Sequence, residues 1–465
     1  MTNVFFLRWG WLLLSVCLYG LLGYNVPRAH FPTLVCLYAL LCWGYLLRIR
    51  PLLTPASAGD EQPAPDAFLF RSAVLFRLLL LGAIPALSDD YARFIWDGRL
   101  LLAGINPFRY LPSELVTGTA GGAFSVDTSL FGRLNSPDYY TVYPPVSQAL
   151  FALAAGASPQ HLPGSVLLLR LPVLLAEIGT MALMRRLLVR FRQNPNLALL
   201  YALNPLVILE LTGNVHLEGV MFFFVLLAVW WWVRPPLAGQ PVPCQRLAVS
   251  AGAFALGVGT KLLPLLLLPL VVARLGWRRG LTYSAVVGVF VCLLFAPFFD
   301  LDMLRHMLTS LDLYIRKFEF NASLYYLIRE AGYYLRGYNV LSQIGGWLSL
   351  LTTLGLLGIA FARTKQGASA PMAARVLWML TLYFAMATTV HPWYISSLVA
   401  ATVFTGIGRG RPFRYPLLWS GLIYLSYAAY QHTPVRESPV LLVLEYVPVL
   451  LLMGAELMQT RTDKF

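Results

Sequence analysis

Charge is scarce in this sequence of 465 residues: 12% of them are charged, whereas 58% are hydrophobic. That charged fraction is about half of what soluble domains carry, and a soluble fold of this size could not bury so much apolar surface. Long, nearly uncharged runs recur from one end of the chain to the other. The composition excludes disorder, collagen, coiled coil and a nucleic-acid-binding globule as descriptions of the whole chain. It predicts a polytopic membrane protein.

Lysine is scarcer still, since only four of the 35 basic residues are lysines. The arginines gather in short connectors at 48–50, 185–192, 274–279 and 409–414. This is the pattern that the positive-inside rule gives to cytoplasmic loops. We therefore interpret the net charge of +14 as topology, and we expect no nucleic-acid partner.

The chain has five cysteines, but no pair of them has the spacing of a metal site or of a disulfide framework. No Gly-rich nucleotide-binding loop is visible either. We therefore expect neither a metal nor a cofactor.

The hydrophobic runs are numerous but uneven in length. They predict an all-α, polytopic bundle of about 12–15 membrane helices that forms one integral membrane domain over residues 1–465. Several runs hold only 12 to 16 apolar residues, fewer than the ~20 needed to cross a bilayer, and these predict half-helices or re-entrant segments. A polar linker at 50–66 separates the second and third runs and is expected on the cytoplasmic side.

Two connectors, 88–141 and 300–340, are long and rich in polar and aromatic residues. Both lack the arginine bias of the short connectors, so we expect amphipathic helices on the outer face in each. One difficulty remains, because two full crossings after Thr141 would place the arginines at 185–192 outside. Either the run at 142–157 is re-entrant, which its short length favours, or the arginine rule fails at this loop.

The first long connector begins with two adjacent acids, Asp89 and Asp90, in the stretch SDDYARFIWDGRLLLAG. As a helix, this stretch lies along the membrane surface and places Asp90, Arg93 and Asp97 on one stripe. Such a pair of acids suggests a catalytic site, in which Arg93 and Arg99 could bind a phosphate. A plain helix cap with surface ion pairs is the alternative.

The stretch NPLVILELTGNVHLEG carries Asn214, His216 and Glu218 in a turn between two apolar helices. Ionisable groups at a membrane boundary are costly to bury, so their concentration predicts a substrate-binding site. A solvated turn is the alternative, and His216 with Glu218 is a weak signal for a metal. Glu210, inside the preceding helix, needs a partner or a proton to be buried there.

Two more polar positions fall on the same face in the predicted topology. Lys261 stands alone between two apolar runs, where its ammonium suits a phosphate, although snorkelling to any phospholipid is the alternative. His391, Trp393 and Tyr394 begin a later run. The histidine could hydrogen-bond a hydroxyl or a phosphate, while the aromatic residues could equally form an interfacial belt. Random boundary polarity would scatter such groups to both faces, so their shared face favours a site.

Five stretches in this order, SDDYARFIWDGRLLLAGINPF, TVYPPVSQALFALAAG, NPLVILELTGNVHLEG, GTKLLPLLLLPL and HPWY, resemble the bacterial polyprenyl-phosphate-sugar-dependent mannosyltransferases of the GT-C superfamily. The resemblance covers the chain from about Asp89 to Tyr394. It implies a GT-C-like bundle in the bacterial inner membrane, with an active site that faces the periplasm. It also implies transfer of a sugar, with inversion, from a polyprenyl phosphate to a hydroxyl of a glycan or lipid acceptor.

The resemblance also assigns roles to residues. It implies that Asp90 is the general base, with Asp89 as the alternative, and that Tyr143, His216 and Glu218 bind substrate. Glu218 stands where the family usually has aspartate. A transporter or lipid flippase is the alternative function, but it would favour internal repeats, and none is convincing. A membrane scaffold without chemistry would leave the ordered polar positions unexplained.

Overall fold

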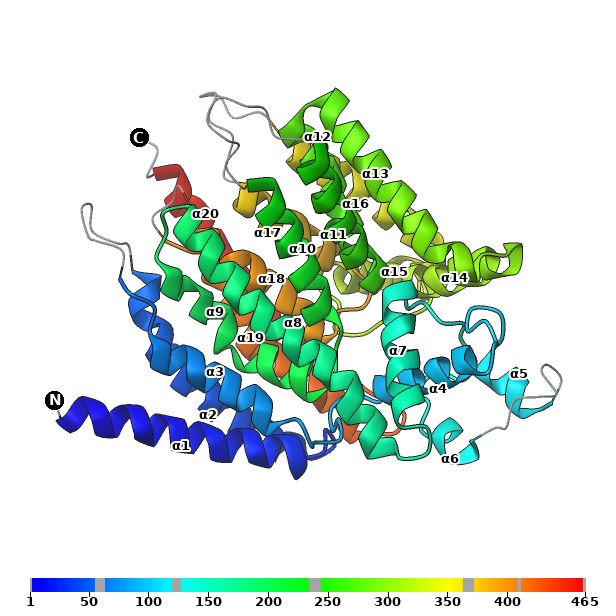
Figure 1. Ribbon diagram of the computed structural model, residues 1–465, viewed down its shortest axis with the longest axis horizontal. Coiled ribbons are helices and arrows are strands. Elements are labelled where there is room, and N and C mark those ends of the chain that lie inside the picture. The colour runs from blue at the N-terminus through cyan, green and yellow to red at the C-terminus, as the bar shows by residue number, and fades with distance from the viewer. Residues whose placement is uncertain are drawn as a thin grey trace.

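The computed structural model describes residues 2–54, 63–118, 127–233, 244–362, 372–407 and 411–462. Within these residues all named elements are helices, and the one isolated β-bridge joins Phe320 to Thr389 (Figure 1). The all-helical fold expected from the sequence is therefore confirmed. The linker predicted at 50–66 and the connector predicted at 88–141 lie only partly within the described residues.

The chain begins with α1 (Thr2–Tyr24), α2 (Phe31–Ile49), η1 (Arg50–Leu53) and α3 (Ala67–Leu79). The first long connector holds α4 (Asp90–Leu102), α5 (Pro112–Val116) and α6 (Thr128–Phe131). The middle of the chain forms α7 (Pro145–Ala157), α8 (Leu162–Arg190), η2 (Pro195–Ala198), α9 (Leu199–Ala202), η3 (Val207–Gly213), α10 (Glu218–Val233) and α11 (Cys244–Thr260).

There follow η4 (Leu263–Leu267), α12 (Leu268–Leu275), α13 (Trp277–Phe295) and η5 (Ala296–Phe298). The second long connector holds α14 (Leu301–Arg316) and α15 (Leu324–Arg336). The remainder consists of α16 (Leu341–Phe361), α17 (Met372–Met386), η6 (Pro392–Ile395), α18 (Ser396–Thr402), α19 (Tyr415–Leu422), η7 (Ile423–Gln431) and α20 (Pro439–Thr462).

Six helices of the described chain are long and apolar enough to cross a membrane. They are Phe5–Tyr24, Phe31–Leu53, Leu162–Arg190, Trp277–Phe298, Leu341–Phe361 and Pro439–Gln459. The pair Pro195–Ala202 and Val207–Gly213, bent by 65° at its break, makes seven if it counts as one span. Four shorter apolar helices account for part of the larger number expected from the sequence. Hydropathy detects apolar runs but not their bends or their ends.

Hydrogen bonds and ion pairs show which loops share an end of the bundle. Arg8 of α1 pairs with Asp66, the N-cap of α3, at 3.1 Å between Nη2 and Oδ2. The backbone N–H of Asp66 donates to Oδ1 of Asn196, just after α8, at 2.7 Å. The arginines at 185–192 therefore lie at the same end as residues 63–66 of the predicted linker, as the arginine rule predicts.

The short helix α7 resolves the difficulty in the order of spans. It has 13 residues, about 20 Å at 1.5 Å per residue, which is too short to cross. It packs closely against α4 at Gly98, where a Cβ atom would lie only 2.3 Å from the carbonyl oxygen of Phe151. Between Thr141 and Arg190 only α8 is therefore long and apolar enough to span, and the re-entrant interpretation of 142–157 agrees with these lengths.

The two long connectors lie together at the opposite end of the bundle, where Figure 1 shows α4, α5, α6, α14 and α15 away from both termini. Tyr140 of the first connector stacks on His306 of α14 with ring centroids 3.7 Å apart. The hydroxyl of Ser310 donates to the carbonyl of Tyr140 at 3.0 Å. Leu301 and Leu304 leave an apolar side of α14 exposed, as in helices that lie in a membrane interface.

Candidate active site

The two adjacent acids at the start of α4 have different surroundings. Asp90 Oδ1 accepts a hydrogen bond from Asn135 Nδ2 at 2.9 Å, and its Oδ2 accepts one from the hydroxyl of Tyr143 at 3.3 Å. Asp89 occupies the N-cap position, but its carboxylate makes no capping hydrogen bond and pairs with Arg28 of the α1–α2 loop. The alternative of a helix cap with surface ion pairs is therefore wrong in its capping bond, whereas the partly exposed ion pair that it expects is present.

Burial raises the pKa of the Asp90 carboxyl above its ordinary value. The hydrogen bonds from Asn135 and Tyr143 and the charge of Lys261 act in the opposite direction, and the charge of Asp89 adds to the rise. A carboxylate with a raised pKa is a stronger base. Asp90 is therefore suited to remove a proton from a hydroxyl group.

The arginines of α4 are engaged elsewhere. Arg93 Nε donates to Asp97 Oδ1 at 2.7 Å, and its Nη1 donates to the carbonyls of Ser136 and Tyr139 at 3.0 and 2.9 Å. Arg93 and Asp97 of the polar stripe are thus buried under the connector, in contrast to the surface helix that the sequence predicts. Arg99 Nη1 pairs with Asp127 Oδ2 at 2.6 Å.

Along α4, Arg99 is nine residues from Asp90, about 14 Å at 1.5 Å per residue. The structure therefore does not bring Arg99 to the acids. Arg93 already holds the connector through its guanidinium, so neither arginine gains support as a phosphate ligand.

The turn between η3 and α10 is joined to the segment that precedes Asp89. The backbone N–H of Leu87 donates to Asn214 Oδ1 at 3.2 Å, and Asn214 Nδ2 donates to Glu210 Oε2 at 3.1 Å. Glu210 Oε1 accepts from the hydroxyl of Tyr427 at 2.9 Å. This buried acid therefore has the partners that the sequence required of it.

The same turn is buried, and its backbone is strained. Asn214, His216 and Glu218 are each at most 4% exposed, so the alternative of a solvated turn is wrong. Val215 has a φ of 61°, which is unfavourable for a β-branched residue. The preceding η3 is a π-helix, a rare geometry that is frequent at functional sites. Such strain costs about 1–3 kcal/mol and persists only where the surroundings fix it.

Two histidines stack on one tryptophan next to this turn. The ring centroids of His216 and Trp393 are 3.8 Å apart, and those of His391 and Trp393 are 4.5 Å apart. His216 Nε2 and His391 Nδ1 are buried and have no hydrogen-bond partner within the described residues. Burial, aided by the charge of Lys261, lowers the pKa of His391 to about 3 and that of His216 well below its ordinary value. Both rings are therefore neutral at physiological pH and can hydrogen-bond a hydroxyl group.

Lys261 does not stand alone, as its sequence context suggests. Its ammonium pairs with Glu218 and lies 5.7 Å from the centroid of the Tyr394 ring. The Lys261 side chain keeps 22% of its surface exposed, whereas Glu218 keeps 3%. The lysine is thus held at the boundary of the site with part of its surface open to a ligand.

The structure therefore brings together five parts of the chain that are far apart in the sequence. These are Asp89–Asp90 with Tyr143, Asn214–Glu218, Lys261 and His391–Tyr394. The shared face predicted from the topology is a real cluster, while the chemical role of each residue stays a prediction.

Arg170 is a structural residue of this cluster that sequence reasoning missed. It is fully buried in α8, and its guanidinium donates to the carbonyls of Thr212 and Gly213 at 2.7 and 2.9 Å. It also donates to the carbonyls of Leu81 and Ala83. One side chain thus ties the start of the turn to the segment that leads to Asp89. An arginine inside an apolar run was the available signal.

Two more residues of the site were missed. Arg28 lies between the first two spans, on the predicted outer face, and so departs from the arginine bias toward cytoplasmic loops. That departure was a usable signal. Asn135 had none, because only the folding of the connector brings it to Asp90.

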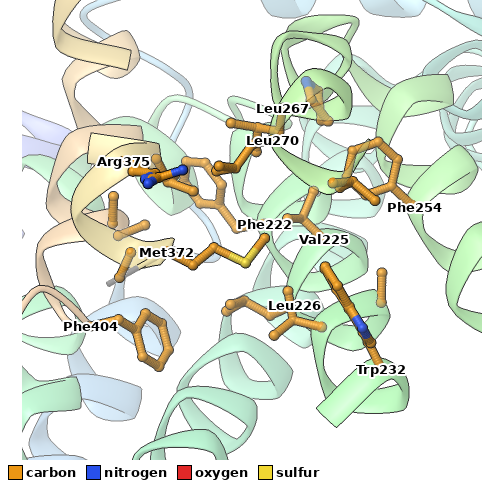
Figure 2. A pocket seen from close by; sticks show the side chains of 18 of the residues that line it. Phe222, Val225, Leu226, Trp232, Phe254, Leu267, Leu270, Met372, Arg375 and Phe404 are labelled. Carbon is orange, nitrogen blue, oxygen red and sulfur yellow. The ribbon is translucent and has the colours of Figure 1, made fainter. Parts of the chain in front are cut away.

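An apolar cavity of about 680 Å³ adjoins the cluster. Figure 2 shows Phe222 and Leu226 of α10 on one side, with Leu270 of α12 and Phe404 around the same space. The other lining residues are also mostly apolar and come largely from α8, α10, α11, η4, α12, α13, α17 and α18. This composition suits a hydrocarbon chain.

The cavity extends along α10 from the neighbourhood of the Lys261–Glu218 pair toward the far ends of α10 and α12. Its lining includes Met221, three residues after Glu218, and Leu263, two residues after Lys261. It also includes Val233 and Arg274 at the far ends of α10 and α12. The distance from Met221 to Val233 is about 18 Å along α10.

The family described as alpha-(1->6)-mannopyranosyltransferase, N-terminal domain, matches residues 14–276, more than half of the sequence. The chain belongs to this mannosyltransferase family. The matched part contains Asp90, His216, Glu218 and Lys261, whereas His391 lies beyond it. No curated protein matches the chain. The family assignment confirms the resemblance to GT-C mannosyltransferases. Together with the six candidate spans of the described chain, it identifies a multi-pass membrane glycosyltransferase.

Proposed function

We propose that this mannosyltransferase takes mannose from a polyprenyl-phosphate carrier and transfers it, with inversion, to a hydroxyl of a glycan or lipid acceptor. The reaction takes place at the periplasmic face of a bacterial inner membrane. Family membership supports the mannose and, through the family's description, an α-(1→6) linkage. The main observation in favour of a lipid-linked donor is the apolar cavity, whose lining at one end lies within three residues of Glu218 and of Lys261 in the sequence.

The cavity favours an isoprenoid chain over a nucleotide. A nucleotide sugar needs hydrogen-bond donors and acceptors around its base and ribose, but this lining is almost wholly apolar. A chain that lies along α10, from Val233 toward Met221, would bring its phosphate to Lys261. A charge-assisted contact with a phosphate in such a partly desolvated place contributes about 1.5–3 kcal/mol.

The chemistry follows from the arrangement of Asp90 and Lys261. Asp90 accepts the proton of the acceptor hydroxyl as that oxygen forms its bond to the anomeric carbon. The bond between this carbon and the phosphate oxygen breaks, and its electron pair leaves with the polyprenyl phosphate. Lys261 stabilises the charge on the leaving phosphate. Inversion to an α-linked product requires a β-linked donor.

The histidine and tryptophan cluster is assigned to the sugar. The neutral imidazoles of His216 and His391 each present a buried nitrogen without a hydrogen-bond partner among the described residues, although His216 Nε2 lies 3.7 Å from Glu210 Oε2. Such nitrogens suit sugar hydroxyls, because an unpaired buried polar atom costs about 1–3 kcal/mol until a ligand satisfies it. We place Asn214, Tyr143 and Tyr394 beside the same substrate.

The test is a transfer assay with the purified protein in detergent. Polyprenyl-phosphate mannose, labelled in the sugar, is incubated with a panel of mannosides, and the product is identified by mass spectrometry and its linkage by NMR. A nucleotide-diphosphate mannose serves as the alternative donor. We expect transfer from the lipid donor to a primary hydroxyl. Transfer from the nucleotide donor alone would contradict the proposal, and movement of the lipid across proteoliposomes without product would favour the flippase.

A further inference from the structure

Arg28 contacts the candidate catalytic pair from a part of the chain that is remote from it in sequence. Its guanidinium pairs with the carboxylate of Asp89. The same guanidinium lies 4.4 Å from the centroid of the Tyr430 ring, near the end of η7. Its backbone N–H points to the carbonyl of Ala86 at 3.4 Å. Arg28 is therefore held between the segment before α4 and the C-terminal third of the chain.

Asp89 does not cap the helix with its side chain but pairs with Arg28 instead. An aspartate at an N-cap position usually accepts the backbone N–H of the second or third helical residue, but the Asp89 side chain makes no such bond. The hydroxyl of Ser88 accepts the N–H of Asp90 instead, at 3.3 Å. The Asp89 carboxylate is thus directed away from the helix axis and toward Arg28, while Asp90 is left to Asn135 and Tyr143.

We propose that Arg28 is a positioning residue, which holds Asp89 in an ion pair and thereby leaves Asp90 as the carboxylate that accepts the proton. Two adjacent acids repel each other when both are ionised. Compensation of Asp89 by Arg28 limits that repulsion and fixes which of the two faces the acceptor. This inference rests on the proposed function and adds a residue to its machinery.

Other charged groups near Asp89 and Asp90 also affect the ionisation of these two acids. The charged and titratable groups that face Asp89 and Asp90 from neighbouring elements are Arg28, Tyr143, Lys261, Tyr430 and, behind Tyr430, Glu210. Arg28 and Lys261 are the two cations in this set. Arg28 pairs with Asp89, whereas Lys261 pairs with Glu218 and its charge also lowers the pKa of Asp90.

The ion pair is partly exposed, with 28% of the Arg28 side chain and 42% of that of Asp89 accessible. Exposed pairs contribute about 0–1 kcal/mol to stability. Replacement of either partner should therefore leave the protein folded. Any large effect on transfer can then be assigned to the site.

The experiment measures the pH dependence of kcat/KM for mannosyl transfer in Arg28→Gln, Asp89→Asn and the double variant. In Arg28→Gln the uncompensated charge of Asp89 should raise the pKa of Asp90 and move the acid limb up by about 1 pH unit. In Asp89→Asn the unpaired Arg28 should move the limb down. The double variant should return to within a few tenths of a unit of wild type, because both charges are gone.

Arg8→Gln is the matched control, since it breaks the ion pair with Asp66 at the other end of α1 and should leave the acid limb in place. Melting temperatures of all variants exclude unfolding as the cause. An equal loss of kcat/KM at every pH in Arg28→Gln, with an unmoved limb, would overturn the positioning role. A wild-type protein without transfer activity would instead overturn the proposed function, so the two failures can be told apart.

Discussion

Replacement of Lys261 by methionine tests the phosphate site, and the structure shows why the single substitution is not enough. Methionine keeps most of the stem and removes the charge. However, Lys261 is the counter-ion of Glu218, which is 3% exposed and has one oxygen without a hydrogen-bond partner among the described residues. Loss of one partner of a buried pair can cost about 3–5 kcal/mol. Lys261→Met alone would therefore mix instability with loss of donor binding.

The double variant Lys261→Met with Glu218→Gln separates these effects. The amide needs no counter-ion, so the comparison of the double variant with Glu218→Gln isolates the contact between Lys261 and the phosphate. That contact is worth about 1.5–3 kcal/mol, and 1.4 kcal/mol corresponds to a factor of ten. We expect the affinity for polyprenyl phosphate to fall roughly 10- to 100-fold, with little change in the affinity for the acceptor.

The detergent-solubilised protein is titrated with polyprenyl phosphate, and binding is measured by isothermal titration calorimetry or by a competition assay. Lys317→Met, on an exposed lysine of the second connector, is the control and should bind as wild type does. Lys261→Arg should recover part of the affinity, since the charge returns with different donor geometry. Equal affinity of the double variant and of Glu218→Gln would refute the phosphate role and leave Lys261 as a snorkelling residue.

Three further predictions follow from the geometry. Because Asp90 must be ionised to act as a base and its pKa is raised, kcat/KM should fall with decreasing pH already above the usual aspartate range of about 4, and Asn135→Ala should move this limb higher still. Arg170→Met should lower the melting temperature strongly, because it leaves buried carbonyls unpaired at about 1–3 kcal/mol each, and Arg170→Lys should rescue little. Gly98→Ala should displace α4 from α7 and reduce transfer, at a cost of about 1–3 kcal/mol. Gly156→Ala, whose Cβ would meet Leu102 at an ordinary 3.5 Å, should have little effect on either stability or transfer.

The sequence predicted the class of fold, and it predicted that Asp90, His216 and Lys261 lie on one face, because hydropathy and charge both follow from the membrane environment. Apolar runs must be helical in a bilayer, since each helix satisfies its own backbone hydrogen bonds. Ionisable residues at membrane boundaries are rare, and Asp90, His216 and Lys261 were singled out in this way as candidates for a site. The arginine bias then placed them on one face.

The remaining features depend on tertiary contacts. The burial of Arg93 and Asp97 under the connector cannot be read from a helical stripe, because a polar stripe can face water or a polar partner equally well. The pairing of Lys261 with Glu218 joins residues 43 positions apart. Val215 has a left-handed backbone conformation, which β-branched residues disfavour, so the local sequence does not predict this conformation.

The most direct test of the account is the single-turnover rate of mannosyl transfer in Asp90→Asn and Asp89→Asn, with donor binding measured in the same preparations. The amide at position 90 keeps the shape of the side chain but cannot accept the proton, and loss of a general base typically costs about 10²–10⁴ in rate. The account predicts a loss of this size in Asp90→Asn with donor affinity nearly unchanged, and a much smaller loss in Asp89→Asn. Wild-type turnover in Asp90→Asn beside an inactive Asp89→Asn would move the base by one residue, and normal turnover in both variants would contradict the mechanism.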